Sequence, residues 1–220
     1  SMAESLSQSP SIGVQAANVC SLPSDESTHP YTRNGALAYA HRWATAEPPY
    51  NHPPYDDFTN LGGDCTNFVS QAIHEGGNAQ MVGSNTYGWY YNNVNDRAAA
   101  WTDVTAIHDF ITQYWVWSAG PEGCDVAQYQ AYEGYLIQYD WTNDSAWDHS
   151  VIIVRSEDYG YHNRYHWVAA HTDDVDNYPF TSYLYDNPNM VYRFVHIERI
   201  DGYAMVYLPL IIKNGSGTAN

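Results

Sequence analysis

The spacing of apolar residues changes near the middle of this chain. Up to about residue 117, apolar residues recur every three or four positions, which is typical of helices that bury one face. After about residue 135, short apolar runs are separated by Gly, Asp and Asn, as in strands joined by turns. Helices that precede strands, instead of alternating with them, favour segregated layers. The sequence therefore predicts an α+β fold in which N-terminal helices pack on an antiparallel sheet.

The individual elements follow from the same patterns. The segment 78–100 is polar and aromatic without a clear period, and it is expected to be a loop. The expected helices run from Thr32 to the pair Pro48-Pro49, from Cys65 to Gly76-Gly77, and from Trp101 to Trp117. The expected strands are 135–139, 150–155, 166–170, 192–200 and 204–212.

The length of 220 residues suits one domain. Residues 1–30 are rich in Ser, Ala, Gln and Pro, and we interpret them as an extended arm. Residues 31–213 are expected to form the domain and residues 214–220 a C-terminal tail.

The charge balance excludes some partners. The chain has 25 Asp and Glu against 8 Lys and Arg, a formal net charge of −17. Such a surface repels phosphate backbones and anionic headgroups, so nucleic acid and anionic membranes are excluded as partners. No run of about eighteen apolar residues exists, so no membrane-spanning helix is expected. The acidity fits an extracellular or salty setting, and attraction of a cationic substrate is the alternative.

The three cysteines form an odd set. One hypothesis pairs Cys20 with Cys124 in a disulfide and leaves Cys65 as a free, reactive thiol. The other leaves all three reduced and buried. The start Ser1-Met2-Ala3 is typical of a cloning remnant, so we expect a native signal peptide to have been removed and the protein to be secreted or at a bacterial-type cell surface.

Cys65 is placed where a nucleophile would be expected. It begins a predicted helix directly after Gly62-Gly63 and Asp64. A helix N-terminus carries partial positive charge, which is expected to lower the pKa of a cysteine, and its free amide groups can hold an oxyanion. The glycines allow the tight turn that such a site needs.

A nucleophilic thiol needs a base, and ten histidines compete for that role. His149 is favoured because it follows Asp148 and begins the apolar run of a strand. The base in turn needs an orienting acceptor. His171, at the end of the next predicted strand, is the first candidate, because neighbouring antiparallel strands bring their ends together. Asp173 and Asp148 are the alternatives.

Four segments of the chain resemble the putative amidase domain family, a branch of the papain-like cysteine hydrolases that also holds the NlpC-type and CHAP peptidoglycan hydrolases. Together they span roughly residues 31 to 180. The segments are Tyr31-Thr32-Arg33-Asn34-Gly35-Ala36 with Tyr39-Ala40 and Trp43; Tyr55 and Phe58 with Gly62 to Gln71 and Gly76-Gly77; Gly134 to Trp141 with Asp148-His149-Ser150; and His171-Thr172-Asp173.

This resemblance implies a papain-like fold with Cys65 as nucleophile, His149 as general base and His171 as third polar residue. Asp64 and Tyr55 match positions near the nucleophile, where they would orient substrate or stabilise charge. The chain departs from the simplest family pattern in a long insert at 77–101 and in the strands of 192–213.

The function that the resemblance implies is hydrolysis of an amide or isopeptide bond in cell-wall peptide, without metal or organic cofactor. A cysteine peptidase or amidase that acts on other peptides or small amides is one alternative. The other is a non-catalytic extracellular binding module, whose groove would be lined by the aromatic residues around Trp89-Tyr90-Tyr91 and Trp115 to Trp117.

Two sets of polar residues could bind metal but are interpreted otherwise. The turn that contains Asp140, Asn143, Asp144 and Asp148 lacks the glycine and terminal glutamate of a calcium loop, so a solvated turn is favoured over a calcium site. His162 and His166 have a spacing that suits zinc on a helix, but their neighbours indicate a hairpin.

Overall fold

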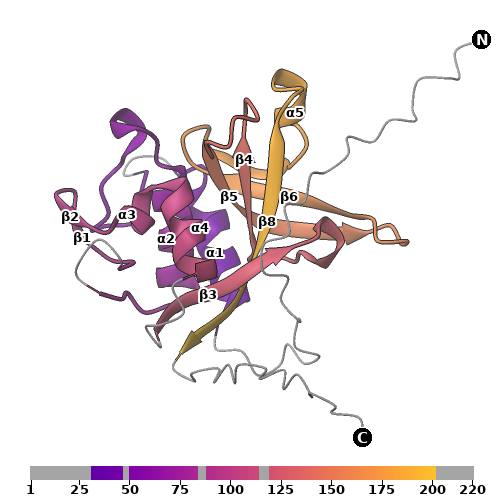
Figure 1. Ribbon diagram of the computed structural model, residues 1–220. Helices are drawn as coiled ribbons and strands as arrows, with labels where there is room; N and C mark the ends of the chain where they lie inside the picture. The colour runs from indigo at the N-terminus through magenta and orange to yellow at the C-terminus, as the bar shows by residue number, and fades with distance from the viewer. Residues whose placement is uncertain (1–30, 47–49, 84–87, 114–118, 202–220) are drawn as a thin grey trace, which may run out of the picture.

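The computed structural model describes residues 31–46, 50–83, 88–113 and 119–201. It contains a six-stranded sheet whose paired strands are all antiparallel, with the helices of the first half gathered on one side of it (Figure 1). The predicted α+β class is confirmed. The predicted arm 1–30, the strand 204–212 and the tail 214–220 lie outside the described residues.

The first two predicted helices are confirmed. The third is wrong in its extent, because it starts earlier and is interrupted. The α-helices are α1 (Arg33–Trp43), α2 (Cys65–Gln71), α3 (Ala99–Thr102), α4 (Val104–Gln113) and α5 (Tyr183–Asp186); α2 continues as a π-helical turn, η3 (Ala72–Gly76), and the 3-10 turns are η2 (Thr59–Leu61) and η5 (Gln128–Gln130).

The interruption between α3 and α4 has a local cause. Asp103 has an extended backbone, with φ −111° and ψ 132°, and therefore ends α3. Its side-chain Oδ1 then accepts a hydrogen bond from the backbone N–H of Ala106, at 2.7 Å. An aspartate that satisfies a free N–H of the first turn is a helix N-cap, so the same residue starts α4.

The main sheet has the strand order β3-β8-β4-β5-β6-β7. Four of the predicted strands are confirmed as β4, β5, β6 and β8, and the predicted loop 78–100 is wrong in part because it contains a small hairpin. The strands are β1 (Tyr91–Asn93), β2 (Asp96–Arg97), β3 (Ala119–Val126), β4 (Leu136–Asp140), β5 (His149–Asp158), β6 (Arg164–Ala170), β7 (Val175–Pro179) and β8 (Val191–Asp201).

The two strands of the main sheet that the sequence did not predict, β3 and β7, are its edge strands. Each contains a proline, Pro121 and Pro179, and β3 also contains Gly120 and Gly123. Proline and glycine weaken a strand assignment from sequence, yet an edge strand tolerates them because one side of it makes no ladder hydrogen bonds.

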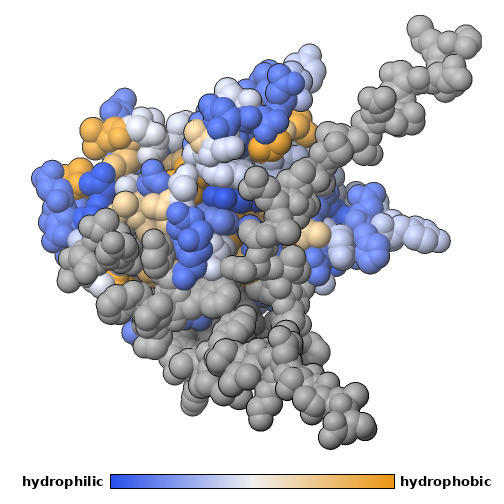
Figure 2. All heavy atoms as spheres, viewed as in Figure 1, coloured by the Kyte–Doolittle hydropathy of each residue, from blue (hydrophilic) through white to orange (hydrophobic). Residues whose placement is uncertain are grey.

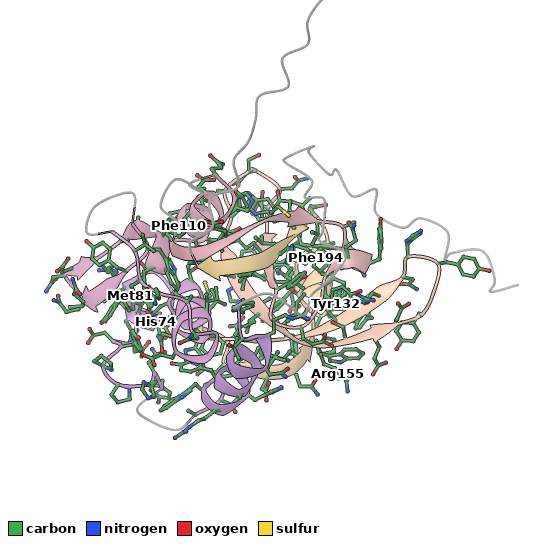
Figure 3. All side chains as sticks on the ribbon, turned by 90° about the horizontal axis from the view of Figure 1, so that it is seen from below. His74, Met81, Phe110, Tyr132, Arg155 and Phe194 are labelled. Carbon is green, nitrogen blue, oxygen red and sulfur yellow. The ribbon has the colours of Figure 1, made fainter. Side chains whose placement is uncertain are left out.

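Both faces of the sheet are covered by apolar side chains. Along β5, Ile152 and Val154 pack with the helices, whereas Val151 and Ile153 pack in a second cluster on the opposite face. This is the two-residue alternation of a strand buried on both faces. In Figure 3, Phe110 of α4 lies in the helical half and Phe194 of β8 in the sheet half.

Helix α1 crosses the η3 turn at a point where only glycine fits. A Cβ on Gly76 would lie 2.5 Å from the carbonyl oxygen of Gly35 and 2.7 Å from Cα of Ala36. The glycine that the sequence predicts as a helix stop therefore also allows two backbones to touch.

No helix among the described residues is long and apolar enough to cross a membrane. On the face shown in Figure 2, hydrophilic and hydrophobic residues are interspersed, and hydrophilic ones dominate at the projecting turn between β5 and β6.

His166 of β6 is a core histidine, fully buried and satisfied by two hydrogen bonds. Its Nδ1 lies 3.0 Å from Oγ of Ser156 and its Nε2 lies 3.0 Å from the carbonyl oxygen of Gln128. The carbonyl can only accept, so Nε2 carries the hydrogen and Nδ1 accepts from the serine. The antiparallel pairing of β5 and β6 confirms the predicted hairpin around it.

Acidification is expected to destabilise the protein through its buried neutral histidines. Burial lowers the pKa of His149 and of His166 from 6.5 to about 4. Between these two values the unfolded chain binds more protons than the folded one, so the free energy of unfolding falls as the pH drops from about 7 to 4. The shift corresponds to about 3 kcal/mol per histidine at most. Urea denaturation at pH 7.0, 5.5 and 4.5 measures the fall.

The variant His166→Gln provides the comparison. It is expected to be less stable than the wild type at pH 7 but to lose less stability on acidification, because it lacks one of the two titrating groups. An equal fall in both proteins would contradict the assignment of His166 as a neutral core residue.

Candidate active site

Two glycines form the turn that leads into α2. Gly62 and Gly63 have φ values of +115° and +116°, in the region that side chains disfavour, and Cys65 is the first residue of the helix. The tight glycine turn and the helix-terminal position predicted for Cys65 are both confirmed.

Asp64, between the turn and the cysteine, is buried and fully occupied by internal hydrogen bonds. Its Oδ1 accepts from the backbone N–H of Phe58 at 2.9 Å and from Nδ2 of Asn67 at 2.8 Å. Its Oδ2 accepts from Nδ2 of Asn51 at 2.9 Å and lies 2.7 Å from Nδ1 of His171. The structure therefore gives Asp64 a structural role, and the carboxylate does not face a substrate as the sequence analysis expected.

His171 is the partner of Asp64 at the end of β6. Its second ring nitrogen, Nε2, lies 2.8 Å from the carbonyl oxygen of Trp43, and its ring stacks on Phe68 with centroids 4.1 Å apart. Its two ring nitrogens therefore face the carbonyl of Trp43 and the carboxylate of Asp64. His171 thereby ties the end of β6 to α1 and to the loop before the nucleophile.

His171 does not orient His149, contrary to the prediction. Ile152 pairs with Ala169, so the register brings Ser150 opposite His171 and places His149 on the other face of the sheet. Residues that alternate along a strand point to opposite faces. The ends of β5 and β6 are neighbours, as predicted, but the register of the two strands could not be predicted. A shift of one residue in that register moves a side chain to the other face, and this separates the two histidines.

Thr172 follows with an unusual backbone. Its φ is +83°, which is rare for a β-branched residue, and its Oγ1 accepts a hydrogen bond from the backbone N–H of Asp64 at 3.0 Å. Strain of this kind persists when surrounding contacts enforce it, and it gathers at functional sites. The next residue, Asp173, is exposed, and its charge helps to raise the pKa of Tyr183.

Cys65 is a free thiol with 6% of its surface exposed. Burial raises its pKa above that of an ordinary cysteine, and the charge of Asp64 adds to this. The backbone N–H groups of Ser150 and Thr66 and the hydroxyl of Thr66 act in the opposite direction without outweighing burial. The expectation that the helix N-terminus lowers the pKa is therefore wrong, because desolvation dominates.

Cys65 is held against β5 by a short chain of hydroxyl groups. The Oγ1 of Thr66 lies 3.8 Å from the sulfur of Cys65 and donates to Oγ of Ser150 at 3.2 Å. Nε2 of Gln138, in the neighbouring strand, donates to the same serine hydroxyl at 3.1 Å. These contacts bring the sulfur to the residue that directly follows His149.

His149 begins β5, as predicted, and its ring sits in an aromatic cluster formed with Tyr139, Trp141 and Tyr183. The ring centroids lie 6.1 Å, 5.5 Å and 5.6 Å from that of His149. Burial lowers the pKa of His149 to about 4, so the ring is neutral near pH 7. Its Nε2 is buried without a hydrogen-bond partner in the described part of the chain.

Cys65 lies next to Ser150, the residue that follows His149, but Cys65 and His149 are not hydrogen-bonded to each other within the described residues. Tyr183 links them, because its ring contacts His149 edge to face and the charge of a Cys65 thiolate affects its pKa. At rest, the pair is a neutral thiol beside a neutral imidazole.

Tyr55 lies away from the first turn of α2. Its hydroxyl donates to Oε1 of Glu75 at 2.7 Å, in the π-helical turn, and its ring stacks on Trp101 at 5.6 Å. The predicted role beside the nucleophile is therefore not supported by its contacts.

Trp89 and Tyr91 also belong to the core, with 0% and 4% of their surface exposed. They pack on Trp101. The groove expected around them is therefore filled, and Trp115 to Trp117 fall outside the described residues.

Cys124 is disulfide-bonded in the structure, whereas Cys65 is free. The hypothesis that all three cysteines are reduced is therefore wrong. Cys20, the expected partner of Cys124, lies outside the described residues, so the pairing itself stays a prediction.

The acidic turn before His149 is fixed by its own backbone. Asp140 accepts from the N–H groups of Thr142, Asp144 and Ser145, and Asp148 accepts from that of Trp141 at 2.8 Å. In the described ranges no three His, Cys, Asp or Glu side chains are grouped to hold a metal ion.

Comparison with known proteins assigns the chain to a family. Residues 30–195 match the family model described as "Putative amidase domain". The chain belongs to this family. It is also 28% identical over 131 residues to the uncharacterized protein YhbB of Bacillus subtilis (strain 168), which covers 58% of this chain and 38% of YhbB. The match thus spans less than half of that protein. No solved structure matches the chain. Family membership indicates an amidase-like hydrolase.

Ser150, Trp141 and Tyr183 are site residues that were not predicted from the sequence. Ser150 and Trp141 stood in the quoted motifs without a role. Tyr183 had no signal of its own, because it is one of 21 tyrosines and lies in a short helix that has no clear period.

Substitution of Asp64 is expected to destabilise the fold. The change Asp64→Asn places an amide N–H₂ among donors and removes the charge that faces His171, which should lower the free energy of unfolding by about 2–4 kcal/mol. The exposed Asp173→Asn should change it by less than about 0.5 kcal/mol. Urea denaturation of both variants measures the difference, and equal stabilities would contradict the structural role of Asp64.

The resting thiol is expected to react slowly. The alkylation rate of Cys65 by iodoacetamide should be below that of free cysteine at pH 7 and should rise above the ordinary cysteine pKa, because the thiolate is the reacting form. The variant Cys65→Ala gives the background. A rate that is already at its plateau below neutral pH would show a preformed thiolate and contradict the effect of burial.

Proposed function

We propose that the protein is a cysteine-dependent amide hydrolase in which Cys65 is the nucleophile and His149 the general base. The observation that carries this proposal is the position of a free cysteine at the start of α2 and next to Ser150. The residue before Ser150 is a buried neutral histidine whose Nε2 has no hydrogen-bond partner among the described residues. Membership of an amidase family supports amide hydrolysis. A neutral imidazole can accept a proton, as a general base must. Both ring nitrogens of His171, in contrast, are already hydrogen-bonded.

The reaction proceeds in two stages. His149 takes the thiol proton as the sulfur of Cys65 attacks the carbonyl carbon, and the carbonyl π electrons move to the oxygen. When the tetrahedral intermediate collapses, the C–N bond breaks and the protonated His149 gives its proton to the leaving amine. Water, deprotonated by His149, then attacks the thioester and releases the carboxylic acid and the thiol. No cofactor is needed.

Proton transfer is coupled to attack, because thiol and imidazole are both neutral at rest. The two side chains must also approach each other, since no hydrogen bond joins them in the described structure. Catalytic hydrogen bonds are often long without substrate and tighten when it binds.

We further propose that the chain has the papain-like arrangement of the NlpC-type and CHAP hydrolases. Support comes from the order of the elements, in which the cysteine begins a helix ahead of the sheet and the histidine begins a strand within it. In this arrangement His171 positions the loop before the nucleophile through Asp64, and Asp173 lies at the exposed side.

The proposed substrate is an amide bond in cell-wall peptide, and the proposed location is outside the cell. The resemblance to peptidoglycan hydrolases supports the substrate. The disulfide at Cys124 supports an oxidising compartment. The net charge of −17 fits the same setting.

Incubation of the protein with purified peptidoglycan and with simple peptide amides, followed by mass analysis of the fragments, tests the activity. Cys65→Ala and His149→Ala are each expected to reduce cleavage by about 10³-fold or more, as removal of a nucleophile or its base does. His162→Gln, an exposed histidine in the turn between β5 and β6, should leave cleavage unchanged.

Full activity of Cys65→Ala would overturn the cysteine mechanism. Failure of the wild type to cleave either substrate would favour the binding-module alternative. Cleavage of amides without cleavage of peptidoglycan would overturn the proposed substrate but keep the chemistry.

A further inference from the structure

Tyr183, the first residue of α5, carries a buried hydroxyl without a hydrogen bond. The side chain has 9% of its surface exposed, and its hydroxyl has no partner among the described residues. Buried polar atoms in folded proteins are nearly always hydrogen-bonded, because an unpaired one costs about 1–3 kcal/mol. A hydroxyl in this state points to a group that is absent from the structure.

The position of Tyr183 indicates where that group would lie. Its ring meets the ring of His149 at 68°, with centroids 5.6 Å apart, and Nε2 of His149 is a second buried atom without a partner. Tyr183 is on the same face of the sheet as His149, opposite to His171. Tyr183 thus contacts His149 and lies close enough to Cys65 for the charge of the sulfur to affect its pKa.

The electrostatic surroundings keep the hydroxyl protonated. Burial raises the pKa of Tyr183, and the charges of Asp173, Tyr178 and Cys65 raise it further. Tyr183 therefore offers a neutral O–H donor over the whole range in which His149 is neutral. The contribution of Cys65 also means that negative charge on the sulfur affects the hydroxyl of Tyr183.

We propose that the hydroxyl of Tyr183 donates a hydrogen bond to the substrate oxygen that becomes the oxyanion when Cys65 attacks. This inference rests on the proposed cysteine mechanism and names a further catalytic residue for it. The hydroxyl transfers no proton: the O–H bond stays intact while the carbonyl π electrons move to the oxygen that accepts from it. The donor is already desolvated, which is the condition under which such hydrogen bonds are strongest.

An alternative role for Tyr183 is to orient the imidazole of His149. Their rings are in contact, yet neither the hydroxyl nor Nε2 of the histidine has the other as a partner. The orienting hydrogen bond is therefore not formed in the structure, and the hydroxyl remains available to substrate.

Two thiol probes separate these roles in Tyr183→Phe. p-Nitrophenyl acetate acylates a cysteine through a tetrahedral oxyanion, whereas methyl methanethiosulfonate reacts by thiol exchange without one. Loss of an oxyanion donor is expected to lower the acylation rate constant of Cys65 by about 10²–10³-fold. The rate of thiol exchange should stay within about twofold, and the acidic limb of the acylation profile should stay near the pKa of about 4 of His149.

Tyr192→Phe is the matched control, because it removes a hydroxyl from the same apolar cluster, where Tyr192 contacts Phe180 and Phe194. It should leave both rates unchanged. An unchanged acylation rate in Tyr183→Phe would overturn the inference, as would an equal loss in both reactions, which would indicate a structural role. A shift in the acidic limb of the pH profile of acylation would also overturn the inference, because it would indicate that Tyr183 orients His149. Acylation that persists in Cys65→Ala would instead overturn the proposed cysteine mechanism.

Discussion

The carboxylate of Asp64 is the contact on which the geometry of the site depends. Its two oxygens gather hydrogen bonds from the preceding loop at Asn51 and Phe58, from α2 at Asn67, and from the end of β6 at His171. The helical layer and the sheet are thus joined at the residue that precedes the nucleophile. Because Asp64 and His171 are 107 residues apart in sequence, Cys65 is held beside β5 only when both layers have docked. The position of Cys65 therefore depends on tertiary structure, and its helix alone could not produce it.

Burial is the second constraint, and it acts on both partners of the proposed reaction. It raises the pKa of Cys65 and lowers that of His149, so each loses its charged form. A preformed ion pair would need polar groups that the aromatic cluster does not supply. The donors close to the sulfur, from Ser150 and Thr66, are too weak to reverse the effect. The site therefore suits a reaction in which negative charge develops on the substrate. Tyr183 is the neutral hydrogen-bond donor that we propose for that charge.

The sequence predicted those features that depend on local spacing. The apolar period placed α1, α2 and four strands, and Gly62-Gly63 before Cys65 predicted the turn that the structure shows. The edge strands were missed because Pro121 and Pro179 argue against a strand in sequence. They are tolerated because one side of an edge strand makes no ladder hydrogen bonds, and the strand order is needed to recognise an edge. The pairing of His171 with His149 failed because register is a long-range property. Trp89 could have lined a groove or filled the core, and sequence alone does not decide between them. Tyr183 could not have been predicted from sequence, because its proposed role depends on its contact with His149 and on the burial of its hydroxyl.

The burial of a protonated thiol also affects how long Cys65 would stay reduced in the proposed mechanism. Peroxides attack the thiolate, and the sulfenic acid that results is easily driven to forms that cannot be recovered. Cys124 is already in its oxidised, disulfide form, whereas Cys65 must remain reduced to act. The desolvation that raises the pKa of Cys65 would thereby slow its oxidation. In the proposed extracellular setting, the sulfur would then stay reduced between encounters with substrate.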